Sequence, residues 1–500
     1  MTRRSKAIPI FDFTGGLNTK SSVTSLELNQ SRDIQNINIL PNGGFEKRQG
    51  NVAFNASAMA SSAAVHGLGY YRQSDGDDFL MAIAGTGVFK SDSLDGTMDT
   101  ITGAVTVTTG QDNIWTHSVL NNLSIFVGGA PDAPIKWNGS GNADVLGGSP
   151  PSGAFGLTAN NRLFIGNTTA NPSRIAWSIL GNPEDWTGTG SGTQDVQAND
   201  GDVLVGAAVH SIDHMLLFKQ NSIHDLAIRT APFPLFPLFR EVGAISKRGI
   251  LNVDGIVYFI TPEPRMKATD GSQIIDFPDT IDNVWDSLNP ARLKYLHGLY
   301  YRRLHQIWWF VSTTSATSHD LVIIWDLKRK CWLRHTTGYK MNVSCIAQDR
   351  TAYCGAYDGK LYRQDVTNVY SDASETNTEI DSILRSGWMG LNDETLLKVA
   401  IHAMVNFQLQ TSGQFELSYG YNFNTDTTIE SISQATTAST YDTAVYDNAF
   451  FGGNSDAVRL IHMSGSGNFF QYAFRHNTAG EAWAINGLTL AMQEGGPNSP

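Results

Sequence analysis

The chain has 500 residues, of which 41% are apolar and 16% charged, and its formal net charge is −12. This length exceeds a single core, so we expect two or three domains, and the low charge density excludes a disordered chain or a coiled coil. The acidic balance argues against a general nucleic-acid binder, which would carry a basic patch. No apolar run reaches the roughly 18 residues of a membrane span.

Residues 1–50 begin with a basic segment that lacks the apolar stretch of an export signal, so we expect the chain to be made and assembled in a cytoplasm. We predict that this region is an N-terminal arm with a ring-contacting strand, because it is polar and glycine-containing. Its candidate interface residues are Phe11, Phe13 and Leu17. Deleting residues 1–20 is expected to weaken assembly more than folding.

Residues 51–365 contain many short runs of β-branched and aromatic residues separated by Gly, Asn, Asp and Pro, which predicts an all-β fold. Six Asp-Gly dipeptides supply tight hairpin turns. Trp325-Asp326 and Tyr357-Asp358-Gly359 resemble a propeller rhythm, although regular WD40 spacing is absent. We predict a degenerate β-propeller here, with a closed barrel or stacked sandwiches as alternatives. Helical periodicity is confined to two short candidates, 282–293 and 392–402, and both also fit single turns or strands.

Residues 230–240 alternate proline with large apolar side chains. Few donors remain for a strand ladder, so this segment is expected to be a stiff loop and cannot be a central strand. Such a loop either covers a core edge or presents anchors to a neighbouring subunit. The candidate interface residues of this segment are Phe233, Leu235, Phe236, Leu238 and Phe239.

The composition changes after Asp365. Residues 366–380 are polar and are predicted to be a linker. Residues 381–492 alternate apolar and polar positions, as at Phe415, Leu417 and Tyr419, which predicts half-buried strands and a β-sandwich-like domain. Residues 493–500 are expected to be a frayed tail.

The chain carries few signatures of chemistry. Cys331, Cys345 and Cys354 have no metal-ligand spacing and fit reduced core residues. No nucleophile elbow or phosphate-binding loop is complete, and His210 and His214 lie in strand-like sequence rather than on a helix face. We therefore expect no catalytic residue, no cofactor and no metal. Acidic pairs such as 77–78 and 184–185 fit solvated loops, and most tryptophans fit the core.

Charge is distributed in blocks along the sequence. Residues 1–50 and 226–366 carry a basic excess, whereas 51–225 and 367–500 are acidic. The two basic blocks are candidates for contacts with acidic partner surfaces or with neighbouring protomers. An ordinary solubilising surface is the alternative interpretation.

Eight segments share an order that is informative beyond their composition. They are 10–22, 43–50, 161–167, 174–186, 216–226, 243–249, 325–332 and 357–362. Their order resembles the tail nozzle (tail tubular protein B-like) proteins of short-tailed, podovirus-type bacteriophages. The resemblance covers about three quarters of the chain, and its motifs belong to the scaffold rather than to catalysis.

This resemblance implies a structural virion protein, assembled in the host cytoplasm into a homohexameric ring of the viral tail. Its partners would be a head-to-tail adaptor above and tail fibres or spikes outside, and double-stranded DNA would pass through the bore at genome ejection without specific binding. We accordingly expect that the chain is not an enzyme. The alternative function is a tail-associated glycan- or receptor-binding β-propeller, with a virion glycosidase as a further rival.

Overall fold

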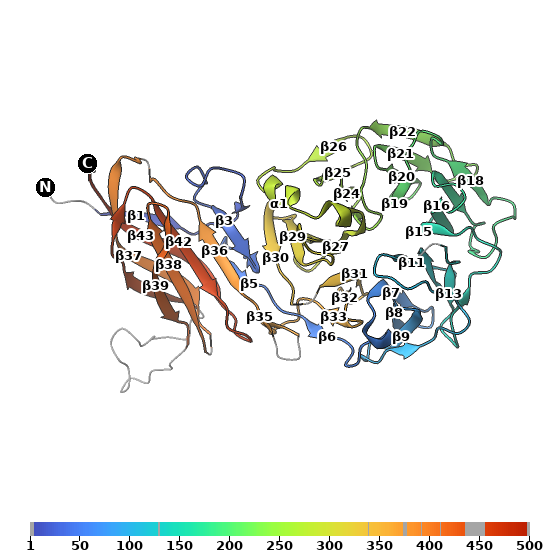
Figure 1. Ribbon diagram of the computed structural model, residues 1–500, viewed down its shortest axis with the longest axis horizontal. Coiled ribbons are helices and arrows are strands. Elements are labelled where there is room, and N and C mark those ends of the chain that lie inside the picture. The colour runs from blue at the N-terminus through green and yellow to red at the C-terminus, as the bar shows by residue number, and fades with distance from the viewer. Residues whose placement is uncertain are drawn as a thin grey trace.

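The computed structural model describes residues 5–128, 131–338, 340–373, 378–391, 393–410, 412–435 and 456–497. Strands dominate these ranges, and Figure 1 shows a ring of small sheets beside a second, sandwich-like body that holds both ends of the chain. The all-β prediction is therefore confirmed. Within the described ranges, no helix is long and apolar enough to cross a membrane.

The ring is a β-propeller. In the described part of the chain, seven four-stranded antiparallel sheets follow one another between residues 52 and 363. The innermost strands of neighbouring sheets contact each other around the ring, and the seventh sheet contacts the first through β31 (Met341–Ile346) and β7 (Val65–Arg72). This closure identifies the sheets as propeller blades and confirms the predicted fold class.

The blades are made of the following strands. Blade one holds β7, β8 (Asp78–Ala84), β9 (Gly87–Asp92) and β10 (Asp99–Thr100). Blade two holds β11 (Trp115–Leu120), β12 (Leu123–Gly128), β13 (Ile135–Trp137) and β14 (Asp144–Val145). Blade three holds β15 (Gly153–Ala159), β16 (Arg162–Thr168), β17 (Arg174–Trp177) and β18 (Gly192–Asp195). Blade four holds β19 (Leu204–Ser211), β20 (His214–Lys219), β21 (Ser222–Ala227) and β22 (Leu235–Arg240).

Blades five to seven complete the ring. Blade five holds β23 (Ile250–Val253), β24 (Ile256–Ile260), β25 (Met266–Thr269) and β26 (Ile274–Asp276). Blade six holds β27 (His297–Tyr301), β28 (Gln306–Val311), β29 (Leu321–Asp326) and β30 (Cys331–His335). Blade seven holds β31, β32 (Ala352–Ala356), β33 (Leu361–Arg363) and the N-terminal strand β6 (Val52–Ala53). Because β6 pairs with β33, the start of the propeller sequence joins its end.

The dipeptide Asp254-Gly255 forms a tight hairpin turn, as the sequence predicted for Asp-Gly pairs. Asp254 and Gly255 adopt φ values of 52° and 87° between β23 and β24, and Val253 pairs directly with Ile256. Two consecutive positive φ values are the signature of a tight turn whose twist matches that of the strands. The four tryptophans of blade six, Trp308, Trp309, Trp325 and Trp332, are buried, as the sequence predicted.

Short helical turns lie between blades five and six and near the start of blade one. They are α1 (Asp282–Asp286), η2 (Pro290–Tyr295) and η1 (Ala60–Ser62). The second candidate helix, 392–402, falls instead largely in the 13-residue strand β37 (Leu396–Gln408).

The second body is built from two sheets. The first has the order β4-β5-β43-β37-β40, with β1 on β43 and β41 on β37, and the second has the order β2-β3-β36-β42-β38-β39. Its N-terminal strands are β1 (Ser5–Ile10), β2 (Gly16–Leu17), β3 (Gln30–Gln35), β4 (Ile37–Ile39) and β5 (Phe45–Lys47). Its C-terminal strands are β36 (Ser382–Ser386), β37, β38 (Gln414–Tyr421), β39 (Asn424–Ser433), β40 (Asp456–His462), β41 (Ser466–Gly467), β42 (Phe470–His476) and β43 (Ala484–Pro497).

Residues 1–50 therefore do not form a separate arm, in contrast to the sequence prediction. β1 pairs antiparallel with β43 from Ile8↔Leu490 to Ile10↔Leu488, and β3 pairs with β36. The prediction of a frayed tail over residues 493–500 also differs from the structure, because strand β43 continues to Pro497. Residues 498–500 lie outside the described ranges. The predicted linker contains the short pair β34 (Ser371–Asp372) and β35 (Thr378–Glu379).

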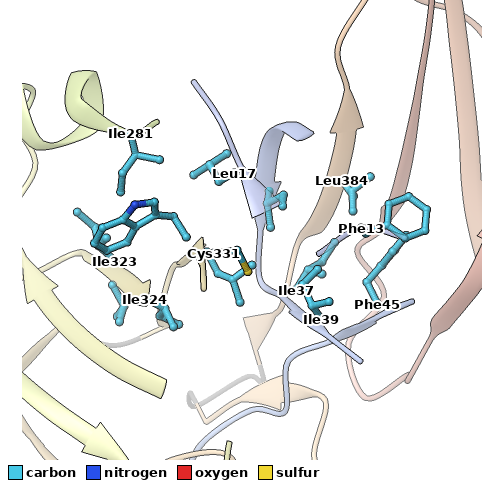
Figure 2. Packing of buried hydrophobic residues seen from close by; sticks show 14 of the residues in the cluster. Phe13, Leu17, Ile37, Ile39, Phe45, Ile281, Ile323, Ile324, Cys331 and Leu384 are labelled. Carbon is cyan, nitrogen blue, oxygen red and sulfur yellow. The ribbon is translucent and has the colours of Figure 1, made fainter. Parts of the chain in front are cut away.

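The apolar core runs without interruption from the sandwich into blade six. Phe13 meets Phe45 edge to face at 4.9 Å, and Phe45 meets Trp483 at 5.4 Å inside the sandwich. Figure 2 shows Leu17 and Ile37 of the sandwich facing Cys331 of β30 across the boundary. The two bodies therefore share one packed interface.

The buried N-terminal strands change the expected result of a truncation. We now predict that removing residues 1–17 unfolds the sandwich, because it deletes strand β1 and the buried Ile8, Ile10, Phe13 and Leu17. Loss of one large buried side chain alone costs about 3–5 kcal/mol. Limited proteolysis should cleave within the sandwich strands 382–386, 396–408 and 470–476 in the truncated chain but not in the full chain. Equal resistance of both chains would contradict this prediction.

Candidate functional site

A cavity of about 620 Å³ opens where blades six and seven meet. Its walls are the β27–β28 turn, the β31–β32 turn and the segment that follows β33. These connections lie at the same end of their blades, because the first strands of all blades run in the same direction around a propeller. We call this cavity the arginine cleft, after Arg302, Arg303, Arg350 and Arg363, which line it.

All four arginine side chains of the cleft are exposed. Arg302 lies over the ring of Tyr300, with 6.0 Å between the guanidinium carbon and the ring centroid. Among the described residues, the guanidinium groups of Arg350 and Arg363 have no hydrogen-bond or ion-pair partner. Their donors therefore face solvent and are available to a ligand.

Arg303 is held more tightly than the other three arginines. Its Nη1 donates to the carbonyl oxygen of Asp365 at 3.2 Å and to Thr367 Oγ1 at 3.3 Å, and its Nη2 donates to Gln49 Oε1 at 2.9 Å. The buried Asp365 carboxylate accepts from Tyr301 Oη at 2.8 Å. Burial raises the pKa of Asp365, while the Tyr301 hydrogen bond and the Arg303 charge oppose that shift. This network fixes the floor of the cleft.

The charge of the cleft is positive overall. Asp349 is its second acidic residue, and its carboxylate accepts from Thr351 N at 2.9 Å and Thr351 Oγ1 at 2.7 Å within its own turn. Two carboxylates thus face four guanidinium groups. Exposed guanidinium groups bind carboxylate, sulfate and phosphate oxygens in a two-pronged geometry, so the arrangement suits an anionic ligand.

A second cavity, of about 410 Å³, continues from the cleft toward the sandwich. It shares Arg303 and His305 with the arginine cleft and adds the basic residues Lys328 and Arg329 and the acidic residue Glu46. Arg329 is paired with Asp326, since its Nη1 lies 3.0 Å from Asp326 Oδ2. The basic surface therefore extends along the junction of the two bodies, and an extended anionic ligand could follow it.

Sequence reasoning did not single out these four arginines. The signal that could have found them was the basic excess of residues 226–366, which contains all of them. Residues 302, 350 and 363 come together because the innermost strands β27 and β31 of adjacent blades contact each other and β33 pairs with β32. No local sequence pattern shows these contacts between distant residues.

The predicted interface residues divide into buried and exposed groups. Phe13, Leu17 and Phe233 are at most 3% exposed and lie in the core of a single chain, so they are not free to contact another subunit. Phe11 and Phe236 are 49% and 51% exposed. The remaining three, Leu235, Leu238 and Phe239, are half-buried.

The proline-rich segment is in part a strand rather than a loop. Its second half forms β22, the outer edge strand of blade four, and the register with β21 shifts near Pro237, which faces His224. An edge position tolerates a residue that has no backbone donor. The prediction that the segment is no central strand is confirmed.

Three of the other groups weighed in the sequence, Asp78, Glu184 and His214, have side-chain partners, whereas His210 Nδ1 is buried without a hydrogen-bond partner among the described residues. Asp78 accepts from Tyr70 Oη, and Glu184 Oε1 lies 2.6 Å from Lys136 Nζ. His214 Nδ1 lies 2.8 Å from Asp225 Oδ2. Within the described ranges, no three His, Cys, Asp or Glu side chains gather in a way that could hold a metal ion.

The chain is similar to known proteins in its structure but not in its sequence. No family model and no curated protein matches the chain. A streptogramin B lyase structure is 14% identical, with a TM-score of 0.44, and covers 63% of this chain and 97% of its own. The WD40 propeller domain of Doa1 is 12% identical, with a TM-score of 0.40, over 63% of this chain and 96% of its own.

A gluconolactonase from Xanthomonas campestris is 12% identical, with a TM-score of 0.34, over 64% of this chain and 90% of its own. The chain is thus similar to propellers that include enzymes, and this contradicts the prediction that it is not an enzyme. The prediction inferred inactivity from missing motifs, but a propeller scaffold can carry catalytic residues from separate blades without a contiguous motif.

Proposed function

We propose that this chain is a binding protein whose propeller receives an acidic glycan in the arginine cleft. The observation that supports this proposal is the convergence of Arg302, Arg350 and Arg363 on one cavity in which the guanidinium groups of Arg350 and Arg363 have no partner among the described residues. Unpaired guanidinium groups at the surface are the usual recognition element for sulfate and carboxylate groups.

The shape of the basic surface favours a polymer over a small ion. The cleft and the cavity next to it together run from blade seven to the sandwich, and Arg303 borders both. A chain of acidic sugars could place successive anionic groups along this path. Because the contacts are exposed to water, the affinity is expected to fall as the salt concentration rises.

The proposal is tested by the affinity for heparin, a sulfated polysaccharide. Arg350→Ala combined with Arg363→Ala is expected to weaken heparin binding at least tenfold at low salt. Arg240→Ala, which removes an exposed arginine from the edge strand β22 of blade four, is the matched control and should change the affinity little. Unchanged binding by the double variant, or binding of neutral dextran with equal affinity, would contradict the proposal.

The resemblance to tail nozzle proteins supports a second candidate, a ring of six copies in a phage tail. In this role adaptor and fibre proteins would flank the ring, and DNA would pass through its bore at ejection. The observation that favours an assembly is a group of exposed apolar side chains on the outer face of the sheet of β37 and β40, which has Asp456 at one end. Met404 pairs with Leu460 there, and Met404, Leu460, Val458 and Phe11 are between 43% and 51% exposed.

Light scattering of the purified chain, alone and mixed with its neighbouring tail proteins, tests this second candidate. A sixfold assembly that Leu460→Asp disrupts is the expected result, because a charge on an apolar contact surface costs desolvation energy. Val145→Asp, at an exposed position on the outer strand of blade two, is the matched control. A monomer under all these conditions would contradict the assembly.

A further inference from the structure

The axis of the propeller contains a cavity of about 370 Å³ that is separate from the arginine cleft. It is lined by residues from the innermost strands of five blades, namely β7, β11, β23, β27 and β31, and by Arg248 just before β23. A volume of this size is within the range of small-molecule sites. Much of its wall is apolar, including Leu68, Ile250 and Val343.

Two basic residues lie side by side in the segment before β23, and the second of them, Arg248, lines the cavity. Lys247 Nζ donates to the carbonyl oxygens of Ile114 at 2.8 Å and Ala154 at 2.5 Å. Arg248 Nη1 donates to the carbonyl oxygen of Asn342 at 2.8 Å, and its Nη2 donates to that of Tyr295 at 3.1 Å. Each cation thereby ties together inner segments of different blades, but neither forms an ion pair with a carboxylate in the described part of the chain.

Lys247 and Arg248, which have no carboxylate partner in the described part of the chain, both have lowered pKa values. Burial, reinforced by the charge of Arg248, lowers the pKa of Lys247 to about 7. Burial also lowers the pKa of Arg248 to about 10. Buried charges are normally paired, and an anion in the cavity would supply the missing opposite charge.

Unpartnered polar groups line the same cavity. His297 is 1% exposed, and within the described ranges neither of its ring nitrogens has a hydrogen-bond partner. Its ring stacks on Phe310 with 4.4 Å between centroids, so its position is fixed by packing. The indole Nε1 of Trp115 is likewise buried without a partner. The two rings offer N–H donors that nothing in the described chain satisfies.

We propose that the axial cavity binds a small organic anion, a carboxylate with an apolar body. Its carboxylate would lie beside Arg248 and accept a hydrogen bond from His297, while its body would contact the apolar strand residues of the wall. A neutral molecule of the same shape would leave the buried charge of Arg248 uncompensated, so charge is the expected discriminator. This site does not depend on glycan binding in the arginine cleft, and either can fail alone.

The probe is benzoate, with benzamide as the neutral control of nearly the same shape. In calorimetric titrations of the full chain, benzoate is expected to bind in the millimolar range or tighter, and benzamide at least tenfold more weakly. His297→Phe should weaken benzoate binding at least tenfold. His462→Phe, which makes the same change at an exposed position on the edge strand β40 of the sandwich, is the matched control and should bind benzoate as the natural chain does.

Hydrogen exchange of the unaltered protein gives a readout that does not depend on the folding of a variant. Benzoate should slow exchange in segments 68–70, 115–117, 297–298 and 343–346, which line the cavity. The proposal is overturned if benzoate does not bind at millimolar concentration, if benzamide binds equally well, or if the protected amides lie elsewhere.

Discussion

Between pH 6.5 and pH 4 the protein is expected to lose stability steeply, because several histidines are buried in a neutral form. Burial lowers the pKa of His319 and of His335 to about 3 and that of His476 to about 4. In the unfolded chain these rings take up protons near pH 6.5, so the unfolded state binds more protons throughout this window. Their stabilising effect is thus complete above pH 6.5 and is lost as the pH falls.

The expected effect is large because the three rings act together. Each contributes up to about 1.4 kcal/mol of stability per pH unit, so these three rings alone should lower the free energy of unfolding by about 4 kcal/mol per pH unit between pH 6 and pH 5. His117 and His297, whose pKa values burial also lowers, add to this loss. Glu46 and Asp365 act in the opposite direction, since burial raises the pKa of both carboxyls. They should moderate the slope at the acidic end of the window.

Urea unfolding at pH 7, 6 and 5 measures this slope. His319→Gln should reduce it by about 1.4 kcal/mol per pH unit, because it removes one titrating ring. Val458→Ala, which changes an exposed side chain without a titrating group on the edge strand β40, is the control and should leave the slope unchanged. A stability that stays constant from pH 7 to pH 5 would refute the assignment of neutral, buried histidines.

Replacement of Asp372 by Asn is expected to cost about 3–5 kcal/mol of stability, because it leaves the charge of Arg48 buried without a partner. The Arg48 and Asp372 side chains are 8% and 3% exposed, and Nη2 and Oδ2 lie 2.5 Å apart. Arg48 also donates to Asn36 Oδ1 at 3.0 Å and to the carbonyl oxygen of Thr336 at 2.7 Å. The pair joins the β5–β6 connection to the end of blade six and to β34.

Thermal and urea unfolding of three variants separate the ion pair from its surroundings. The double variant Arg48→Met with Asp372→Leu should be less destabilised than Asp372→Asn, since it leaves no charge behind. Asp381→Asn breaks the exposed pair with Arg475, whose side chains are 38% and 47% exposed, and should cost less than about 1 kcal/mol. Equal losses for Asp372→Asn and Asp381→Asn would contradict the role given to the buried pair.

Local features of the fold were predictable from the sequence because they depend on neighbouring residues. Asp254-Gly255 produces a two-residue turn at the expected place, and the apolar runs of blade six are buried strands. Similar turns at Asn121-Asn122 and Asn160-Asn161, with positive φ at all four residues, were overlooked although asparagine also favours this conformation.

Long-range pairings were not predictable in this way. Ile8 pairs with Leu490 across almost the whole chain, and nothing in residues 1–50 indicates which distant strand completes their sheet. The apolar pattern of 392–402 fits a helix turn as well as a strand, and only the neighbours β43 and β40 make β37 a strand. The arginine cleft depends on the same kind of distant contact.

The binding proposal is tested most directly by hydrogen exchange of the full chain with and without a heparin oligosaccharide at low salt. Bound oligosaccharide should slow exchange in segments 302–305, 347–351 and 363–367, which line the arginine cleft, and added salt should remove this protection together with binding. Protection confined to other surfaces of the propeller or to the sandwich, with these three segments unchanged, would contradict the proposed site.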